Sequence, residues 1–235
     1  MMKTLLLLSA LTLGTLANAS PQPSEVVVLC ALHQLHEQAH FYTYADLSAA
    51  IERLHPDVLA VELTPADLKD KVEQKNKREY QNSVYPLLRQ HNWATVALEP
   101  EGQRRTELIG WLRGAEQELQ KTSPQKDEAF DTYNDTLFKY LLSQWQSGAD
   151  VNASWTDHLF AVKHSFQHGL YGPQEEQGWE GWNQYFLQQI ITAAKQNPGK
   201  RIVVIVGVEH GYWLREHLRK QSGVKLLDTV DSLQH

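Results

Sequence analysis

Four short apolar runs, rich in β-branched residues, most constrain what this chain can fold into. They are Val26–Cys30, Val58–Val61, Ala94–Leu98 and Ile202–Val206. Runs that are this short and nearly continuous are typical of strands buried on both faces of a parallel sheet. Helical spacing separates the first three: Ala45–Leu54 forms one pattern, and Thr64 can cap a second that begins at Pro65 and runs toward His91. The alternation predicts an α/β fold with a largely parallel, right-handed central sheet.

Residues 103–198 lack strand patterns and predict a helical insertion before the fourth strand. Helical patterns lie near Glu107–Gln120, Glu128–Gln146, Trp155–Gln167 and Gly178–Lys195, with expected breaks at Pro124, Gly148, Gly169 and Pro198. After the fourth strand we expect a helix from about Tyr212 to Gln221 and a short edge strand at Val224–Leu227. We therefore predict one α/β domain over residues 20–235, with a sheet of about five strands flanked by helices.

The first 19 residues have the pattern of a cleavable signal peptide. Lys3 precedes an apolar run over Thr4–Leu16, and Ala17-Asn18-Ala19 places small residues where a signal peptidase cuts. The run is shorter than the ~20 residues that span a bilayer, and no other stretch is apolar enough to do so. We expect cleavage after Ala19, a periplasmic or secreted protein, and no stable membrane insertion afterwards.

Composition narrows the classes of function. The net charge of −6, and the acidic residues that interrupt the basic stretch Lys69–Arg78, argue against nucleic-acid binding. The single cysteine, Cys30, excludes an internal disulfide and any cysteine-rich metal site, and its place in an apolar run predicts a buried strand position. The 11 histidines leave chemistry by His, Asp and Glu available.

Titratable residues follow four of the predicted strands. His33 follows the first, Glu62 the second, Glu99 the third, and Glu209-His210 the fourth. Polar residues are common where strands meet loops, but the carboxyl ends of parallel strands also form the ligand crevice of open α/β sheets. Imidazole and carboxylate together suit Zn²⁺, Mn²⁺, Fe²⁺ or Co²⁺, and such a site can activate water. No serine lies in a Gly-x-Ser-x-Gly elbow, which disfavours an ordinary serine hydrolase.

The late motif Gly207-Val208-Glu209-His210, the acid Glu62 after the second strand, and Trp182-Asn183 in the preceding helix form a recognisable set. In these features the chain resembles the superfamily that joins TraB pheromone-shutdown proteins, Tiki Wnt-cleaving metalloproteases, erythromycin-esterase-type proteins and the ChaN haem-binding lipoprotein. Members share a Gly-x-x-His motif after the first strand as well. Here Cys30-Ala31-Leu32-His33 has Cys in place of that Gly, and Glu209 fills a place usually taken by a small residue.

The resemblance implies an exported, metal-dependent hydrolase that acts on a peptide or ester bond of a peptide or small molecule. His33, Glu62 and His210 would hold the metal or polarise its water, and Glu99 would be a second base or orienting group. Asn183, together with Glu209, is a candidate for substrate contact. A ChaN-like protein that binds haem or metal is an alternative, and the Cys30 departure also leaves a non-catalytic binding module open. The sequence does not indicate an oligomeric state.

A second motif competes with this interpretation. His36-Glu37-Gln38-Ala39-His40 matches the His-Glu-x-x-His signature of zinc proteases, which requires both histidines on one helix and a third ligand downstream. It begins three residues after His33, where we expect a loop, so a milder hypothesis is that His36 and His40 line the pocket and His36 contacts substrate. We expect the later histidines His164 and His168 to be solvated or packed, and Trp179 to belong to the helical core or to an aromatic lid.

Overall fold

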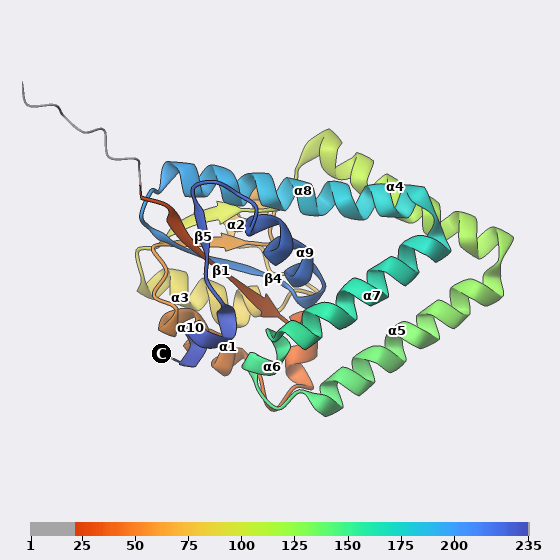
Figure 1. The fold of residues 1–235 in the computed structure, drawn as a ribbon, viewed down its shortest axis with the longest axis horizontal. Coiled ribbons are helices and arrows are strands. Elements are labelled where there is room, and N and C mark those ends of the chain that lie inside the picture. The colour runs from red at the N-terminus through yellow and green to blue at the C-terminus, as the bar shows by residue number, and fades with distance from the viewer. Residues whose placement is uncertain (1–21, 235) are drawn as a thin grey trace, which may run out of the picture.

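Five parallel strands form one sheet in the order β3-β2-β4-β1-β5 (Figure 1). The computed structural model describes residues 22–234, so the predicted signal peptide lies outside the described residues. The strands are β1 (Ser24–Ala31), β2 (Val58–Val61), β3 (Ala94–Ala97), β4 (Arg201–Gly207) and β5 (Val224–Leu226). The predicted parallel α/β sheet is confirmed, including the short edge strand at its end.

The last long strand, β4, lies at the centre of the sheet between β1 and β2. Ile202 pairs with Val26 on one side and with Val58 on the other. At the far end, Gly207 pairs with Ala31, so the carboxyl ends of β1 and β4 are adjacent. This order brings the ends of three strands together although they are far apart in sequence.

Helices cover both faces of the sheet, and alternate strand residues face them. Val27 and Leu29 belong to the same buried cluster as residues of α1 (Tyr44–Arg53) and α3 (Tyr85–Gln90). Val26 and Val28 belong to a second cluster with residues of α8 (Pro173–Gln196) and α9 (Val208–Leu218). This two-sided burial explains why the strands are apolar almost throughout. A short helix, α10 (Thr229–Gln234), ends the described chain.

The predicted helical insertion is present as α4 to α8. It comprises α4 (Gly102–Thr122), α5 (Pro124–Gln144), α6 (Gly148–Val151), α7 (Ser154–Tyr171) and α8. Figure 1 shows α4, α5 and α7 extending to one side of the sheet. The predicted break at Gly169 is wrong, because α7 continues to Tyr171 and ends at Gly172, whose φ is +84°. Glycine is the residue that adopts such a φ without strain.

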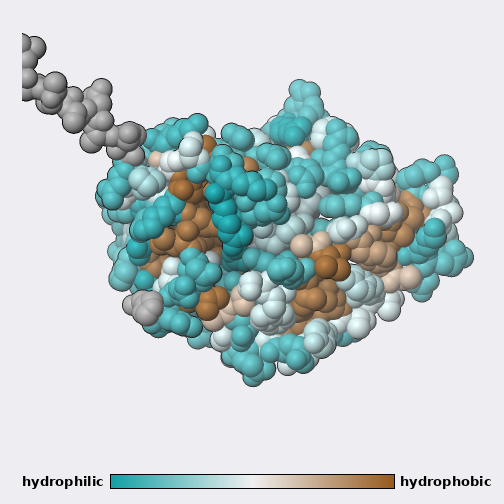
Figure 2. Space-filling model, in the orientation of Figure 1, coloured by the Kyte–Doolittle hydropathy of each residue, from teal (hydrophilic) through white to brown (hydrophobic). Residues whose placement is uncertain are grey.

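Apolar side chains are also exposed on this helical side of the molecule. They are Tyr140 on α5 and Trp155, Val162 and Phe166 on α7. Figure 2 shows apolar surface on the side where α5 and α7 lie. In the part of the chain that the structure describes, no helix is both long enough and apolar enough to cross a membrane.

Two helix predictions need correction. Thr64 caps a helix as expected, by accepting the backbone N–H of Asp67, but α2 (Pro65–Asp70) ends at Lys71 in the left-handed conformation, with φ +52°. An irregular segment, residues 71–79, then leads to a π-helical turn, η2 (Tyr80–Val84), and to α3, so the single helix predicted toward His91 is wrong. The helix after β4 begins at Val208, directly after the strand and not at Tyr212.

Candidate functional site

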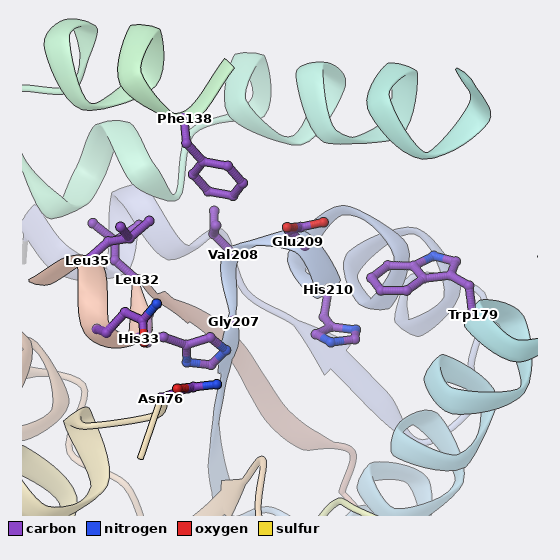
Figure 3. A pocket seen from close by; sticks show the side chains of 12 residues that line it. Leu32, His33, Leu35, Asn76, Phe138, Trp179, Gly207, Val208, Glu209 and His210 are labelled. Carbon is purple, nitrogen blue, oxygen red and sulfur yellow. The ribbon is translucent and has the colours of Figure 1, made fainter. Parts of the chain in front are cut away.

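The three residues predicted to hold a metal ion, His33, Glu62 and His210, lie side by side at the carboxyl ends of β1, β2 and β4. Nε2 of His33 and Nε2 of His210 are each 3.9 Å from the same atom, Oε1 of Glu62. His33 begins a 3₁₀-helix, η1 (His33–Glu37), while His210 stands in the first turn of α9. Figure 3 shows the two rings on either side of the strand end at Gly207. The central position of β4 produces this arrangement.

Glu79 orients the His33 ring. Nδ1 of His33 is 2.7 Å from Oε1 of the fully buried Glu79, and because a carboxylate only accepts, Nδ1 carries the hydrogen and donates it. Burial lowers the pKa of His33, but the carboxylates of Glu79 and Glu62 outweigh that effect and the net pKa is raised. The backbone of His33 is left-handed, with φ +53°, an unusual conformation for a non-glycine residue. Such strain is typical of functional sites.

Gly207 is needed because of His33. A Cβ atom at Gly207 would lie 2.5 Å from Nε2 of His33, well inside van der Waals contact. The φ of Gly207 is −57°, so its backbone is one that any residue adopts. The glycine that opens the late Gly-x-x-His motif therefore makes room for the histidine of the early one.

Asn183 orients the His210 ring in the same way. The Asn183 side-chain NH₂ donates to the backbone carbonyl of Trp179 at 2.9 Å, which turns Oδ1 toward His210. Oδ1 is 2.8 Å from Nδ1 of His210, so Nδ1 is the donor and the Nε2 lone pair remains free. Burial lowers the pKa of His210 to about 4, with Glu62 opposing that shift. The ring is therefore neutral near pH 7, and it stacks on Trp179 with centroids 4.7 Å apart.

Glu62 is a charged carboxylate with both oxygens in use. Its Oε2 accepts the Gly207 backbone N–H at 2.6 Å, and its Oε1 is 2.8 Å from Nζ of Lys77. Burial raises the pKa of Glu62, but Lys77, His33 and His210 outweigh burial and hold the pKa well below its usual value. The Glu62 oxygen nearest to the two rings, Oε1, is thus the same oxygen that Lys77 contacts.

Lys77 and Glu79 also belong to the site, although no sequence motif indicated them. Both lie in the irregular segment 71–79, where a continuous helix was predicted. The Lys77 ammonium contacts the carboxylates of Glu62 and Glu99 and, at 3.0 Å, the Glu62 backbone carbonyl. Glu99, predicted as a second base, is therefore already ion-paired with Lys77, and Arg105 lies 3.7 Å from its other oxygen. The stretch 69–79 has no apolar periodicity, and this lack of a helical pattern is the one signal in the sequence that indicates a loop.

A cavity of about 390 Å³ opens beside the two rings. Its walls combine apolar side chains with the edges of His33 and His210 (Figure 3); the apolar ones include Leu32, Leu35, Phe138, Trp179 and Val208. Phe138 comes from α5 and Trp179 from α8, so the helical insertion forms part of the wall. Trp179 was expected in the helical core or in a lid, and it contributes to this wall.

The two remaining substrate candidates, Glu209 and His36, are engaged within the protein. Glu209 lines the cavity, but its Oε2 is 2.5 Å from Nζ of Lys163 and 2.9 Å from Nε2 of His164. His36 is buried: its Nε2 accepts the Leu32 backbone N–H at 2.9 Å, and its Nδ1 is 2.7 Å from the Tyr42 carbonyl. His36 does not line the cavity.

The zinc-protease interpretation of His36–His40 is wrong. The signature requires an α-helix that carries both histidines on one face. Here a 3₁₀-helix ends at Glu37, and His40 is exposed beyond that end. Glu37 forms a surface ion pair with Arg78 at 2.6 Å. The histidines of this segment therefore do not form a zincin site.

Cys30 is fully buried, as predicted, and the fold adapts to it. A Cβ atom at Gly211 would lie 2.5 Å from the Cys30 Sγ, so Gly211 on α9 provides the space that the cysteine side chain needs. Arg215 donates to the same sulfur at 3.3 Å. The resemblance predicts a glycine at position 30; here that position is a cysteine, and the glycine lies opposite it at Gly211 on α9. The residue with a left-handed backbone at this strand end is His33.

The donor types of the site fit a divalent metal ion, but the donor atoms are farther apart than they would be around a bound ion. Two Nε2 atoms and one carboxylate, with each Nδ1 held by a second residue, are the donor types of a ligand set typical of Zn²⁺ and its neighbours. Within residues 22–234, no three His, Cys, Asp or Glu side chains are already placed to hold an ion. Tetrahedral donors at ~2.0–2.1 Å from a metal are about 3.3 Å apart, compared with 3.9 Å here. Lys77 also contacts the carboxylate oxygen that the metal would use.

Comparisons with protein-family models, with curated proteins and with solved structures gave no match to this chain.

Proposed function

We propose that this protein is a hydrolase of peptide or ester bonds, with its site at His33, Glu62 and His210. The observation that carries the proposal is the convergence of two oriented imidazole Nε2 atoms on one carboxylate oxygen beside an open cavity. We also propose that these three residues hold a divalent metal ion, either Zn²⁺, Mn²⁺, Fe²⁺ or Co²⁺. The likeness to the TraB/Tiki superfamily and the exported location remain predictions from the sequence.

The protein itself orients the two histidine rings and keeps the His210 ring neutral. Glu79 and Asn183 hold the two rings with Nε2 toward Glu62, and Gly207 lets the His33 ring approach the strand end. A bound metal ion in such a site lowers the pKa of a water ligand and polarises a carbonyl group. The low pKa of His210 keeps that ring neutral, which is the form that ligates metal.

The cavity supports a substrate that carries an apolar group. Leu32, Leu35 and Phe138 face the space next to His33 and His210. Burying an aliphatic or aromatic substituent there contributes about 25 cal/mol per Å² of apolar area removed from water. We expect substrates with an apolar acyl or side-chain group next to the bond that is cleaved.

The test combines metal analysis with hydrolysis assays. Purified protein should contain a transition metal, and p-nitrophenyl esters or peptides with apolar side chains should be cleaved in a reaction that a chelator stops. His33→Ala and His210→Ala should each abolish turnover. His40→Ala, an exposed histidine of the neighbouring segment, is the matched control and should retain it. Metal-free protein whose activity survives both substitutions would contradict the proposal. A haemin titration followed at the Soret band, with His33→Ala for comparison, tests the haem-binding alternative.

A further inference from the structure

The ammonium group of Lys77 is the cation that contacts the carboxylates of this site. Its Nζ contacts carboxylate oxygens of both Glu62 and Glu99 and the Glu62 backbone carbonyl. We infer that Lys77 is the resident cation of the site, and that Lys77 and a divalent metal ion compete for Oε1 of Glu62. The inference rests on the proposed function and adds to it a residue that sets how tightly the metal is held.

The competition follows from the oxygen that is involved. Oε2 of Glu62 accepts the Gly207 N–H and faces that backbone. Oε1 is the atom that lies 3.9 Å from each of the two imidazole Nε2 atoms, and it is also the atom that Lys77 contacts at 2.8 Å. An ion shared by both rings and Glu62 therefore has to use the oxygen that Lys77 holds.

Lys77 has other acceptors that do not depend on this oxygen. The Glu99 carboxylate and the Glu62 backbone carbonyl both accept hydrogen bonds from its ammonium group. An ammonium that lost Oε1 would keep two partners. A buried cation is costly only when it loses its partners. Lys77 can therefore give up Oε1 of Glu62 to a metal ion without being left unpaired.

The charges around Lys77 also favour such an exchange. Glu62 and Glu99 are buried, at 4% and 6% exposure, and Lys77 is the cation in direct contact with both. Buried carboxylates require a compensating charge. Either the ammonium or a metal ion can supply that charge to Glu62, and this is the condition under which two cations replace each other at one oxygen.

The experiment measures metal affinity directly. Protein stripped with a chelator is titrated with Zn²⁺ and with Mn²⁺ by calorimetry, for wild type, Lys77→Met and Lys75→Met. Lys75 is an exposed lysine of the same segment and serves as the matched control. We expect Lys77→Met to bind at least about tenfold more tightly, within the range of ordinary coupling between two ligands, and Lys75→Met to match wild type. Adding Glu62→Gln to Lys77→Met should remove the gain.

Thermal unfolding supplies a second measurement. Lys77→Met without metal should have a lower Tm than wild type, and metal should raise its Tm more than it raises that of wild type. Equal affinity in wild type and Lys77→Met, or weaker binding in the variant, would overturn the competition while leaving the metal site in place. Absence of binding in both would overturn the metal site as well. If Lys77→Met does not fold, Lys77→Gln removes the charge while keeping a polar head, and the same outcomes apply.

Discussion

Gly207→Ala should destabilise the protein through a single contact with His33. The new Cβ would lie 2.5 Å from Nε2 of His33, and the ring cannot turn aside without leaving Glu79, to which it is bonded at 2.7 Å. Overpacking, or loss of one hydrogen bond to a charged group, costs about 1–3 kcal/mol. Because φ at Gly207 is −57°, the alanine backbone is unstrained, and the gain of about 0.4–1 kcal/mol from the reduced entropy of the unfolded chain is offset by the poorer N-cap that alanine makes. We expect a net loss of roughly 1–3 kcal/mol.

A double-mutant cycle with His33→Ala isolates that contact. The free energy of unfolding is measured by urea denaturation for wild type, both single variants and the double variant. In the His33→Ala background the clash is gone, and the entropy gain of about 0.4–1 kcal/mol is offset because alanine is a poorer N-cap than glycine, so Gly207→Ala should be nearly neutral. Most of the destabilisation is therefore expected to disappear in that background. Equal destabilisation in both would refute the argument that Gly207 exists to accommodate the His33 ring.

Three further predictions concern burial, pH and substrate. Burial raises the pKa of Cys30 to about 11, so a thiol reagent such as Ellman's should react with the protein only after denaturation. Burial lowers the pKa of His164 to about 4, against about 6.5 in an unfolded chain. The stability that comes from neutral His164 is therefore present above pH 6.5 and is lost as the pH falls toward 4, and His164→Gln should flatten the pH dependence of unfolding over that range. Phe138→Ala should raise KM for p-nitrophenyl esters of longer acyl chains about tenfold, roughly the value of the apolar area lost. Tyr140→Ala, an exposed aromatic on the same helix, should leave KM unchanged.

The strands and their parallel direction follow from sequence, because burial on both faces leaves a strong pattern. Val26–Cys30 and Ile202–Val206 are continuous apolar runs, and both are fully buried strands in the structure. The position of site residues just after such runs then places His33, Glu62 and His210 at one edge. For these three residues the pattern and the geometry agree, because strand ends are fixed by the ladder and not by the loops that follow.

The segment that contains Lys77 and Glu79 was not predictable in the same way. Thr64 and Pro65 clearly mark the start of a helix. The residues after Asp70, where the helix ends in the structure, are mostly charged types that also favour helices. The helix stops because Lys71 adopts a left-handed conformation, which no local residue type requires. What holds the segment is tertiary: the Glu79–His33 bond and the Lys77 contacts all join it to distant strand ends. Such partners are not visible in a local pattern.

Glu209 shows a related difficulty on the other side of the site. From sequence it stands next to His210 and is a natural candidate for substrate contact. In the structure, neighbours on a helix point in different directions, and Glu209 pairs with Lys163 and His164 of α7. His164 was expected to be solvated or packed. It is packed, with its ring stacked on Trp179 at 3.8 Å.

The central place of β4 also has a consequence for how the molecule assembles. The strand pairs with β1 across 176 positions of sequence, as at Glu25 and Arg201. During synthesis β1 and β2 leave the ribosome before β4, the strand that separates them in the finished sheet, and seven α-helices are made between β2 and β4. The first hundred residues therefore contain His33 and Glu62 without the strand that joins them. Closing such a long loop costs entropy and slows strand pairing, so we expect the cluster of His33, Glu62 and His210 to form only after β4 has been made.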